Sequence, residues 1–155
     1  MNQMKTYPYS HLSMKPGDIL YSPIGRSTYF VGHTVIIGTD LQVKESLPRR
    51  PSGNSLSIET FWSRHNKGDM ITLLRAKEGQ LAAAKWATDY VQAVKSYHLG
   101  NYDIQNLAKN YCSKFVVQAY YFGANIKLAS KLNRFIPPQY LRYSLNLKRI
   151  ALFQC

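Results

Sequence analysis

The fold is decided by residues 32–46, which read GHTVIIGTDLQVKES. Two runs rich in β-branched and aromatic residues, Tyr29–Ile37 and Leu41–Ser46, flank the turn-like triplet Gly38-Thr39-Asp40. Runs of this composition on either side of a glycine-containing turn are typical of a β-hairpin. The stretch therefore predicts two adjacent antiparallel strands.

A three-residue loop centred on Thr39 determines which side chains share a face of this hairpin, because side chains alternate along a strand. It places His33 directly opposite Glu45, with about 5 Å between their Cβ atoms. The other four residues of that face are apolar: Val35, Ile37, Leu41 and Val43. The pattern predicts an imidazole oriented by a carboxylate. A polar cross-strand pair without catalytic duty is the alternative, and a loop with an even number of residues would put Glu45 on the other face.

The rest of the chain shows further hydrophobic patterns. Apolar residues recur at helical spacing from Gly79 to His98, which predicts the longest helix. A second helix is expected near Tyr111–Phe122, closed by Gly123, and Pro48–Ser55 is expected to be an exposed loop. The shorter elements are strands at Asp18–Tyr21, Asp69–Arg75 and Leu145–Phe153, a helix at Ile58–Trp62 and a helical turn from Pro137 to about Tyr143. Strands that precede the main helices predict an α+β fold.

The size and composition of the chain predict a single domain over residues 1–155, because 45% of the residues are hydrophobic and 18% are charged. Residues 1–15 are expected to form a more loosely packed N-terminal segment. This segment lacks the apolar core of a secretory signal, and no later stretch approaches the roughly 20 apolar residues of a membrane span. A cytoplasmic location is the resulting expectation.

The formal net charge of +12 would favour polyanionic partners, but the basic residues are scattered and no basic run reaches five. A solvated basic surface is therefore favoured, no dedicated nucleic-acid site is expected, and contacts with anionic surfaces stay open. Cys112 and Cys155 lie in no C-x-x-C or Cys/His cluster, so neither a metal nor another cofactor is expected.

Cys112 is the candidate nucleophile. It falls at the predicted N-terminus of the second helix, where free N–H groups and the helix dipole stabilise a thiolate. It precedes Phe115 and Val116 by three and four residues, so it shares their inner face. A buried, unreactive cysteine is the alternative interpretation. His65 is the one rival to His33 as base, but it lacks a neighbouring strand carboxylate.

Three further residues are candidates for substrate contact. Tyr111 adjoins the nucleophile, Tyr21 lies on the first predicted strand, and Arg26 belongs to a glycine-containing loop that could receive a substrate carboxylate. A packing role for the two tyrosines and a plain exposed loop around Arg26 are the alternatives.

Several blocks of the sequence together resemble a known superfamily. In chain order they are Pro16-Gly17-Asp18-Ile19-Leu20, Gly32-His33-Thr34-Val35-Ile36-Ile37, Val43-Lys44-Glu45-Ser46, Tyr111-Cys112-Ser113-Lys114-Phe115-Val116, and Ile136-Pro137-Pro138-Gln139-Tyr140-Leu141 with Ser144. They are similar to the successive blocks of the circularly permuted NlpC/P60 papain-like superfamily, which includes YiiX/YaeF-like and lecithin:retinol-acyltransferase-like proteins. The resemblance runs from about Pro16 to Ser144.

The resemblance implies a permuted papain-like α+β core, with an antiparallel sheet or partial barrel packed against helices. It also implies Cys112 as nucleophile, His33 as base and Glu45 as the residue that orients His33. The implied activity is that of a cysteine peptidase, amidase or acyltransferase working through a thioester. Two residues depart from the pattern: Thr34 stands where small apolar residues are frequent, and Lys114 replaces a common acidic residue.

The substrates to expect are a small peptide, a cell-wall-type peptide, an amino-acid amide or a lipid ester. Two other classes of function stay open. One is a non-catalytic papain-like module that binds an amino acid or small amide, and the other is a basic protein that binds nucleic acid or a membrane surface.

Overall fold

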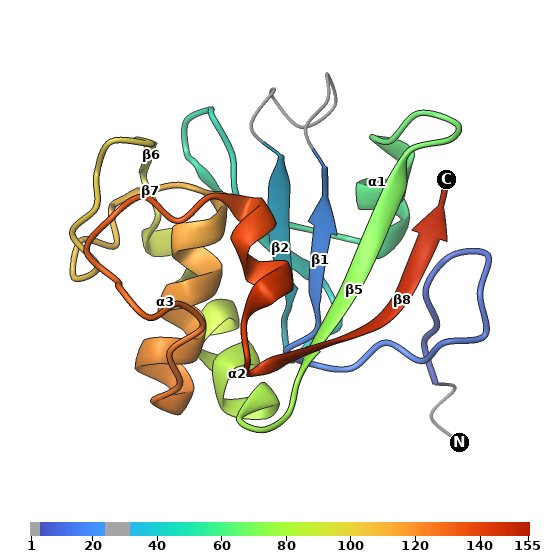
Figure 1. The fold of residues 1–155 in the computed structure, drawn as a ribbon. Coiled ribbons are helices and arrows are strands. Elements are labelled where there is room, and N and C mark those ends of the chain that lie inside the picture. Colours follow the sequence, from blue (N-terminus) through green and yellow to red (C-terminus); the bar gives the residue numbers. More distant parts are fainter. Residues whose placement is uncertain (1–3, 24–31) are drawn as a thin grey trace.

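The computed structural model describes residues 4–23 and 32–155, and its centre is an antiparallel sheet in the order β4-β3-β2-β1-β5-β8 (Figure 1). The six strands are β1 (Ile19–Ser22), β2 (His33–Ile37), β3 (Val43–Ser46), β4 (Gly53–Leu56), β5 (Met70–Ala76) and β8 (Leu147–Gln154). The sheet is open and does not close into a barrel. A separate parallel pair is formed by β6 (Ser96–Tyr97) and β7 (Lys109–Asn110).

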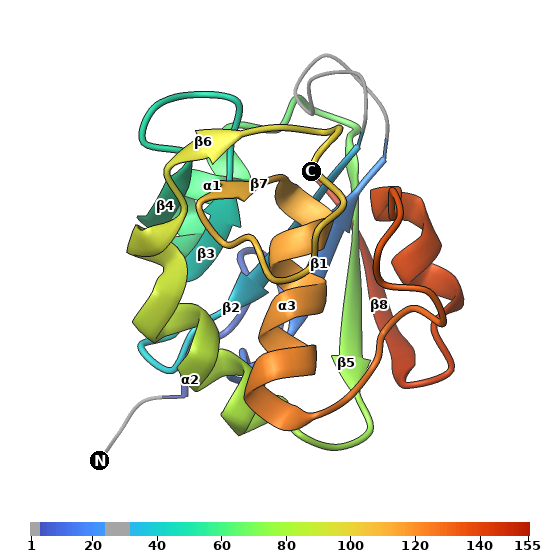
Figure 2. The same ribbon diagram turned by 90° about the vertical axis from the view of Figure 1, so that its left-hand side faces the viewer.

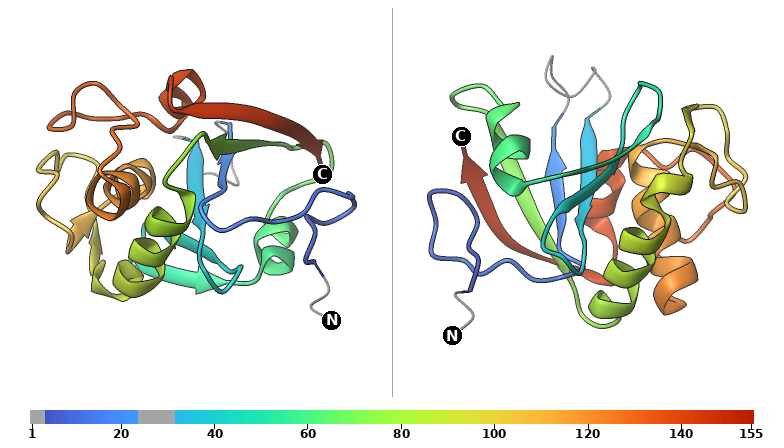
Figure 3. Two further views of the ribbon diagram at one scale, coloured as in Figure 1. Left: turned by 90° about the horizontal axis from the view of Figure 1, so that it is seen from below. Right: turned by 180° about the vertical axis from the view of Figure 1, so that it is seen from behind.

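Helices cover both faces of the sheet. The two longest, α2 (Gln80–Tyr90) and α3 (Cys112–Ala124), pack together on one face (Figure 2), and α1 (Ile58–Ser63) lies apart from them (Figure 3). Neighbouring strand residues belong to different cores: Ile36 packs with α2 and α3, whereas Val35 packs with α1. The described residues also form two 3-10 segments, η2 (Val91–Ala93) and η3 (Pro138–Tyr143). This arrangement confirms the predicted α+β class, with an antiparallel sheet packed against helices.

The β2–β3 hairpin has the predicted strands but a different register. Ile36 pairs with Lys44 and Ile37 with Val43, whereas a loop centred on Thr39 would have paired Ile37 with Leu41. The loop instead consists of Thr39, Asp40 and Leu41, because Leu41 takes a left-handed conformation (φ 58°) and the N–H of Gly38 donates to the carbonyl of Gln42. The centre of the turn moves by one residue and the pairing by two. Side-chain parity is therefore kept, and His33 and Glu45 still share a face.

Two predicted helix boundaries are wrong. The helix expected from Gly79 to His98 ends at Tyr90 and tightens into the 3-10 segment η2, and the chain is extended only from Val94, whose carbonyl accepts from the N–H of Gly53. Gly123 lies inside α3 and does not close it. A Cβ at Gly123 would stand 2.7 Å from the carbonyl oxygen of Ala82, so the glycine permits close approach of α2 to α3. Asn125, with φ 56°, takes the left-handed capping position instead.

Two other segments differ from expectation. Part of Pro48–Ser55, expected to be a loop, belongs to β4, which pairs with β3 at the edge of the sheet. In the N-terminal segment, expected to be loosely packed, Tyr7 and Met14 are buried in the core beside Leu20, and Thr6 forms a β-bridge with Ser13 within the segment. No helix in the described ranges is both long and apolar enough to cross a bilayer.

Candidate active site

The β2–β3 ladder stops before it reaches the start of β2, and this opening creates the site. Pairing between β1 and β2 continues to His33, but the β2–β3 pairing comprises only Ile36 with Lys44 and Ile37 with Val43. The N–H of Ile37 points to the β1 side, since it donates to Asp18, so alternation turns the N–H of Thr34 toward β3. That N–H meets the thiol of Cys112 in place of a strand partner, and this contact lowers the thiol pKa.

Cys112 is the first residue of α3, as predicted. Tyr111 caps the helix without a side-chain hydrogen bond, and the first turn carries no acidic residue. The N–H of Ser113 contacts the thiol, which is the polarity that stabilises a thiolate at a helix N-terminus. The hydroxyl of Ser113 donates to the carbonyl of Ile136, which ties the segment before η3 to this end of the helix.

His33 lies between the thiol and a carboxylate. Its Nε2 donates to Oε1 of Glu45 at 3.0 Å, and its ring is also hydrogen-bonded to Cys112. Because Nε2 is occupied by Glu45, Nδ1 is the nitrogen left for the thiol. Glu45 is not directly opposite His33 as expected, because the register is shifted by two, but the diagonal position on the same face is still within reach. The structure thus brings together the three residues predicted as Cys, His and carboxylate.

Electrostatics within the trio favour a charged pair. Burial alone would lower the pKa of His33, but hydrogen bonds with Cys112 and Glu45 outweigh it and raise that pKa to about 9. Burial would raise the pKa of Cys112, but His33 and the N–H groups of Thr34 and Ser113 lower it. Burial would also raise the pKa of Glu45, yet His33 and Arg64 lower it to about 2. All three residues are buried, with exposed fractions of 7% for His33, 1% for Cys112 and 0% for Glu45.

Sequence reasoning missed two partners of Glu45. Arg64, directly after α1, donates from Nη2 to Oε1 at 2.5 Å and to Oε2 at 2.9 Å. Asn54 on β4 donates from Nδ2 to Oε2 at 3.2 Å. Neither residue lies in a recognisable local pattern, and Asn54 sits in a stretch expected to be a loop. The one sequence signal near Arg64 is the adjacent His65, which is a candidate base.

His65 is not a second base for the thiol. Its Nδ1 donates to the carbonyl of Phe61 at 3.0 Å, and its Nε2 lies 2.8 Å from the hydroxyl of Ser22. Burial is the main cause that lowers the pKa of His65, so the ring is neutral and Nε2 accepts from Ser22. Ser22 pairs with His33 across β1 and β2, which places this neutral pair beside the candidate site.

Of the three residues predicted for substrate contact, two are buried and the third is not among the described residues. Tyr111 is buried and its Oη accepts from the N–H of Ile136 at 3.1 Å, so it anchors a segment and does not line an open cleft. Tyr21 is also buried, and its ring packs under the guanidinium of Arg142 at 5.0 Å. Arg26 lies outside the described residues.

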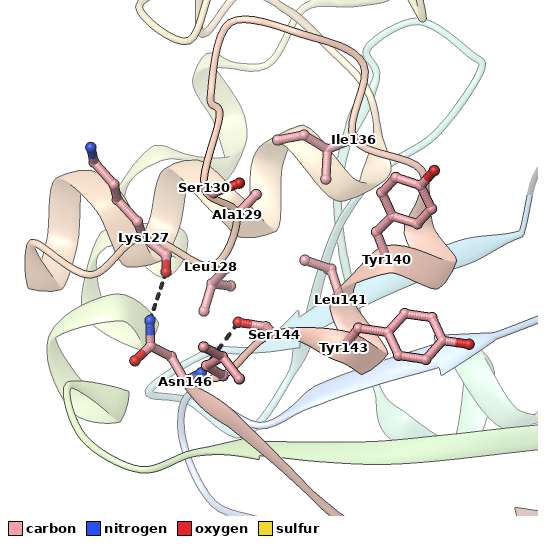
Figure 4. Close-up of a pocket in the computed structure, with 11 residues that line it drawn as sticks. Lys127, Leu128, Ala129, Ser130, Ile136, Tyr140, Leu141, Tyr143, Ser144 and Asn146 are labelled. Carbon is pink, nitrogen blue, oxygen red and sulfur yellow. Dashed lines mark hydrogen bonds between the residues drawn. The ribbon is translucent and has the colours of Figure 1, made fainter.

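A cavity of about 580 Å³ opens next to η3. Figure 4 shows Tyr140, Leu141 and Tyr143 on one side and Leu128 and Ile136 on the other. Ile136 is the residue hydrogen-bonded to both neighbours of Cys112, through Tyr111 Oη and Ser113 Oγ. The wall of this largely apolar cavity is therefore connected to the N-terminus of α3.

Comparison with solved structures finds the same fold in the metalloprotein YiiX from Escherichia coli O157:H7. The two share 14% sequence identity and a TM-score of 0.61, over 91% of this chain and 98% of that one. The chain therefore has a YiiX-like fold. No protein-family model and no curated protein sequence matches it.

A metal does not fit the residues of this site. Across residues 4–23 and 32–155, no group of three His, Cys, Asp or Glu side chains has an arrangement that could hold a metal ion. Both carboxylate oxygens of Glu45 and Nε2 of His33 already bind protein partners. These three atoms are therefore not free to hold an ion.

Proposed function

We propose that this protein is a cysteine hydrolase or acyltransferase that acts on an amide or ester through a thioester at Cys112. One observation carries the proposal: His33 is bonded through Nε2 to the buried carboxylate of Glu45 and faces the Cys112 thiol, at a helix N-terminus, with its other nitrogen. A nucleophile, a base and an orienting carboxylate in contact are the parts that covalent acyl transfer requires.

In the proposed reaction, the Cys112 thiolate attacks the substrate carbonyl and forms a tetrahedral intermediate. The N–H of Cys112 is the proposed donor to the oxyanion. His33 then gives its Nδ1 proton to the departing amine or alcohol as the bond to the leaving group breaks, and a thioester remains. Water or an acceptor, deprotonated by His33, attacks the thioester and releases the acyl group and the thiolate.

The proposed substrates are a small or cell-wall-type peptide, an amino-acid amide, or a lipid ester, with a slight preference for an amide. The largely apolar cavity beside η3 supports a substrate that carries an apolar group. Its wall at Ile136 is joined to both residues that flank Cys112, so an occupant of the cavity would be positioned relative to the thiol.

One observation favours a second candidate, the papain-like binding module without turnover. The Cys112 side chain is almost completely buried, whereas reactive cysteines usually lie in partly exposed surroundings. A module of this kind would retain the trio as a structural network and would have an unreactive thiol.

The rate of alkylation by iodoacetamide, followed separately for Cys112 and Cys155 by peptide mass spectrometry, distinguishes the two. Cys155 is an internal reference, because burial raises its thiol pKa while the pKa of Cys112 is lowered. For an enzyme, the alkylation rate of Cys112 should rise through an inflection below pH ~8.5 and well below that of Cys155. His33→Gln should move the Cys112 inflection upward. A Cys112 thiol that reacts only after unfolding, or that titrates with Cys155, would support the binding module.

A further inference from the structure

Glu45 is held by more than His33. Its side chain is fully buried and lies against Arg64, whose side chain is 31% exposed and whose Nη2 contacts both carboxylate oxygens. Oε1 is shared between Arg64 and His33, so the hydrogen bond that orients the imidazole and the ion pair with Arg64 meet at one atom. A change at Arg64 is therefore transmitted to His33 through a single oxygen.

A second arginine supports the other oxygen. Nη2 of Arg49 donates to Oδ1 of Asn54 at 2.5 Å, which fixes the amide so that its Nδ2 donates to Oε2 of Glu45. Donors from the end of α1 and from β4 thus hold the carboxylate in the one orientation that aims Oε1 at His33. Since Arg64 is the donor that contacts both oxygens, it is the main determinant of that orientation.

We propose that Arg64 is a positioning residue for the acyl-transfer reaction: its ion pair with Glu45 fixes the carboxylate on His33 and sets the pH range in which the His33–Cys112 pair is charged. The inference rests on the proposed function, since it assigns to Arg64 the tuning of that same pair. Arg64 touches neither the thiol nor the imidazole and acts only through Glu45.

The charges around His33 give the direction of this tuning. The imidazole faces Glu45 from β3, Cys112 from α3, and His65 and Arg64 from the segment after α1. His65 is neutral, so Arg64 is the fixed cation of this set, and it offsets part of the negative charge of Glu45. Its removal should raise the pKa values of Glu45, His33 and Cys112, because the loss of a nearby cation favours the protonated form of each group.

A purely structural role predicts something else. The Arg64 guanidinium lies 5.4 Å from the centre of the Phe61 ring, and its loss would remove this packing. Weaker packing would lower stability but would leave the titration of a folded site unchanged. The position of the inflections on the pH axis therefore separates the two roles.

The test compares the pH dependence of Cys112 alkylation by iodoacetamide in the wild type, Arg64→Gln and Arg64→Lys, with Arg149→Gln as control. Arg149 is exposed on β8, on the far side of the sheet order from β3. Arg64→Gln should move the Cys112 inflection upward by at most about 1 pH unit, less than the loss of a charge in contact with the thiol, because Arg64 acts through Glu45. Arg64→Lys, which keeps the charge, should restore most of the wild-type position, and Arg149→Gln should match the wild type.

Three outcomes would be read differently. An unchanged profile in Arg64→Gln, beside a wild type with a low Cys112 inflection, would overturn the role of Arg64 and leave the proposed function standing. A wild-type Cys112 without a low inflection would overturn both. If Arg64→Gln does not fold, Arg64→Met, which keeps an apolar stem over Phe61 and removes the charge, takes its place with the same expected shift.

Discussion

Replacement of Cys112 by alanine should abolish acyl transfer. Hydrolysis of p-nitrophenyl acetate, or of any ester or amide that the wild type accepts, is expected to fall at least about 10³-fold, because no other group in the site can form the thioester. Steady-state release of p-nitrophenol measures this directly. The fold should persist, since alanine keeps the helix N-terminus and removes one buried sulfur atom.

Cys155→Ala is the matched control for this substitution. Cys155 ends the chain, is only partly buried, and contacts the Gly68–Asp69 turn through its backbone. Its loss should leave turnover within about twofold of the wild type, as for a surface substitution away from the site. Full activity in Cys112→Ala would rule out the proposed function. A loss of turnover in Cys155→Ala would instead point to Cys155 as the nucleophile.

The largest effect on stability is expected at Asp18. Its carboxylate is completely buried and accepts from the Tyr7 hydroxyl at 2.7 Å, the Lys15 N–H at 3.0 Å, and Nε and Nη2 of Arg75 at 2.7 and 2.8 Å. Asp18→Ala would take the carboxylate acceptor from the buried Tyr7 hydroxyl and from the Arg75 guanidinium, which would keep only the carbonyl of Ser13. The free energy of unfolding should fall by about 3–5 kcal/mol, the cost of breaking a buried ion pair from one side.

Asp89→Ala supplies the comparison. Asp89 also accepts from a cation, Lys85, at 2.7 Å, but both side chains are exposed on α2. Exposed pairs of this spacing contribute little to stability, because water and salt screen the two charges. The loss of unfolding free energy, measured by urea denaturation, should therefore be several-fold larger in Asp18→Ala than in Asp89→Ala. Equal losses would show that burial of the Asp18 network does not matter to stability.

The sequence was sufficient to predict the three central residues of the site because local rules determine their positions. Hairpin parity depends on whether the loop has an odd or even number of residues, so a turn misplaced by one position still put His33 and Glu45 on one face. The N-terminus of α3 was predictable because helical spacing begins at Cys112.

What could not be predicted depends on contacts between distant segments. Beyond the end of α2 and η2, the carbonyl of Val94 accepts from Gly53 on β4, and the position of Gly123 inside α3 follows from the close approach of α2. The ion pair of Arg64 with Glu45 joins residues 19 positions apart on elements whose relative placement no local pattern encodes. The sequence places Asp18 at the start of a predicted strand and in a short block, and neither pattern predicts that it ties the N-terminal segment to β5.

The most direct test of the account is a search for the covalent intermediate. Wild-type protein is mixed with p-nitrophenyl acetate, quenched with acid during the first turnover, and mapped by peptide mass spectrometry. One acetyl group is expected on Cys112, removed by hydroxylamine as a thioester is, and absent when His33 is replaced by Gln. Release of p-nitrophenol with the acetyl group on Cys155 or on a lysine, or with no adduct on Cys112, would contradict it.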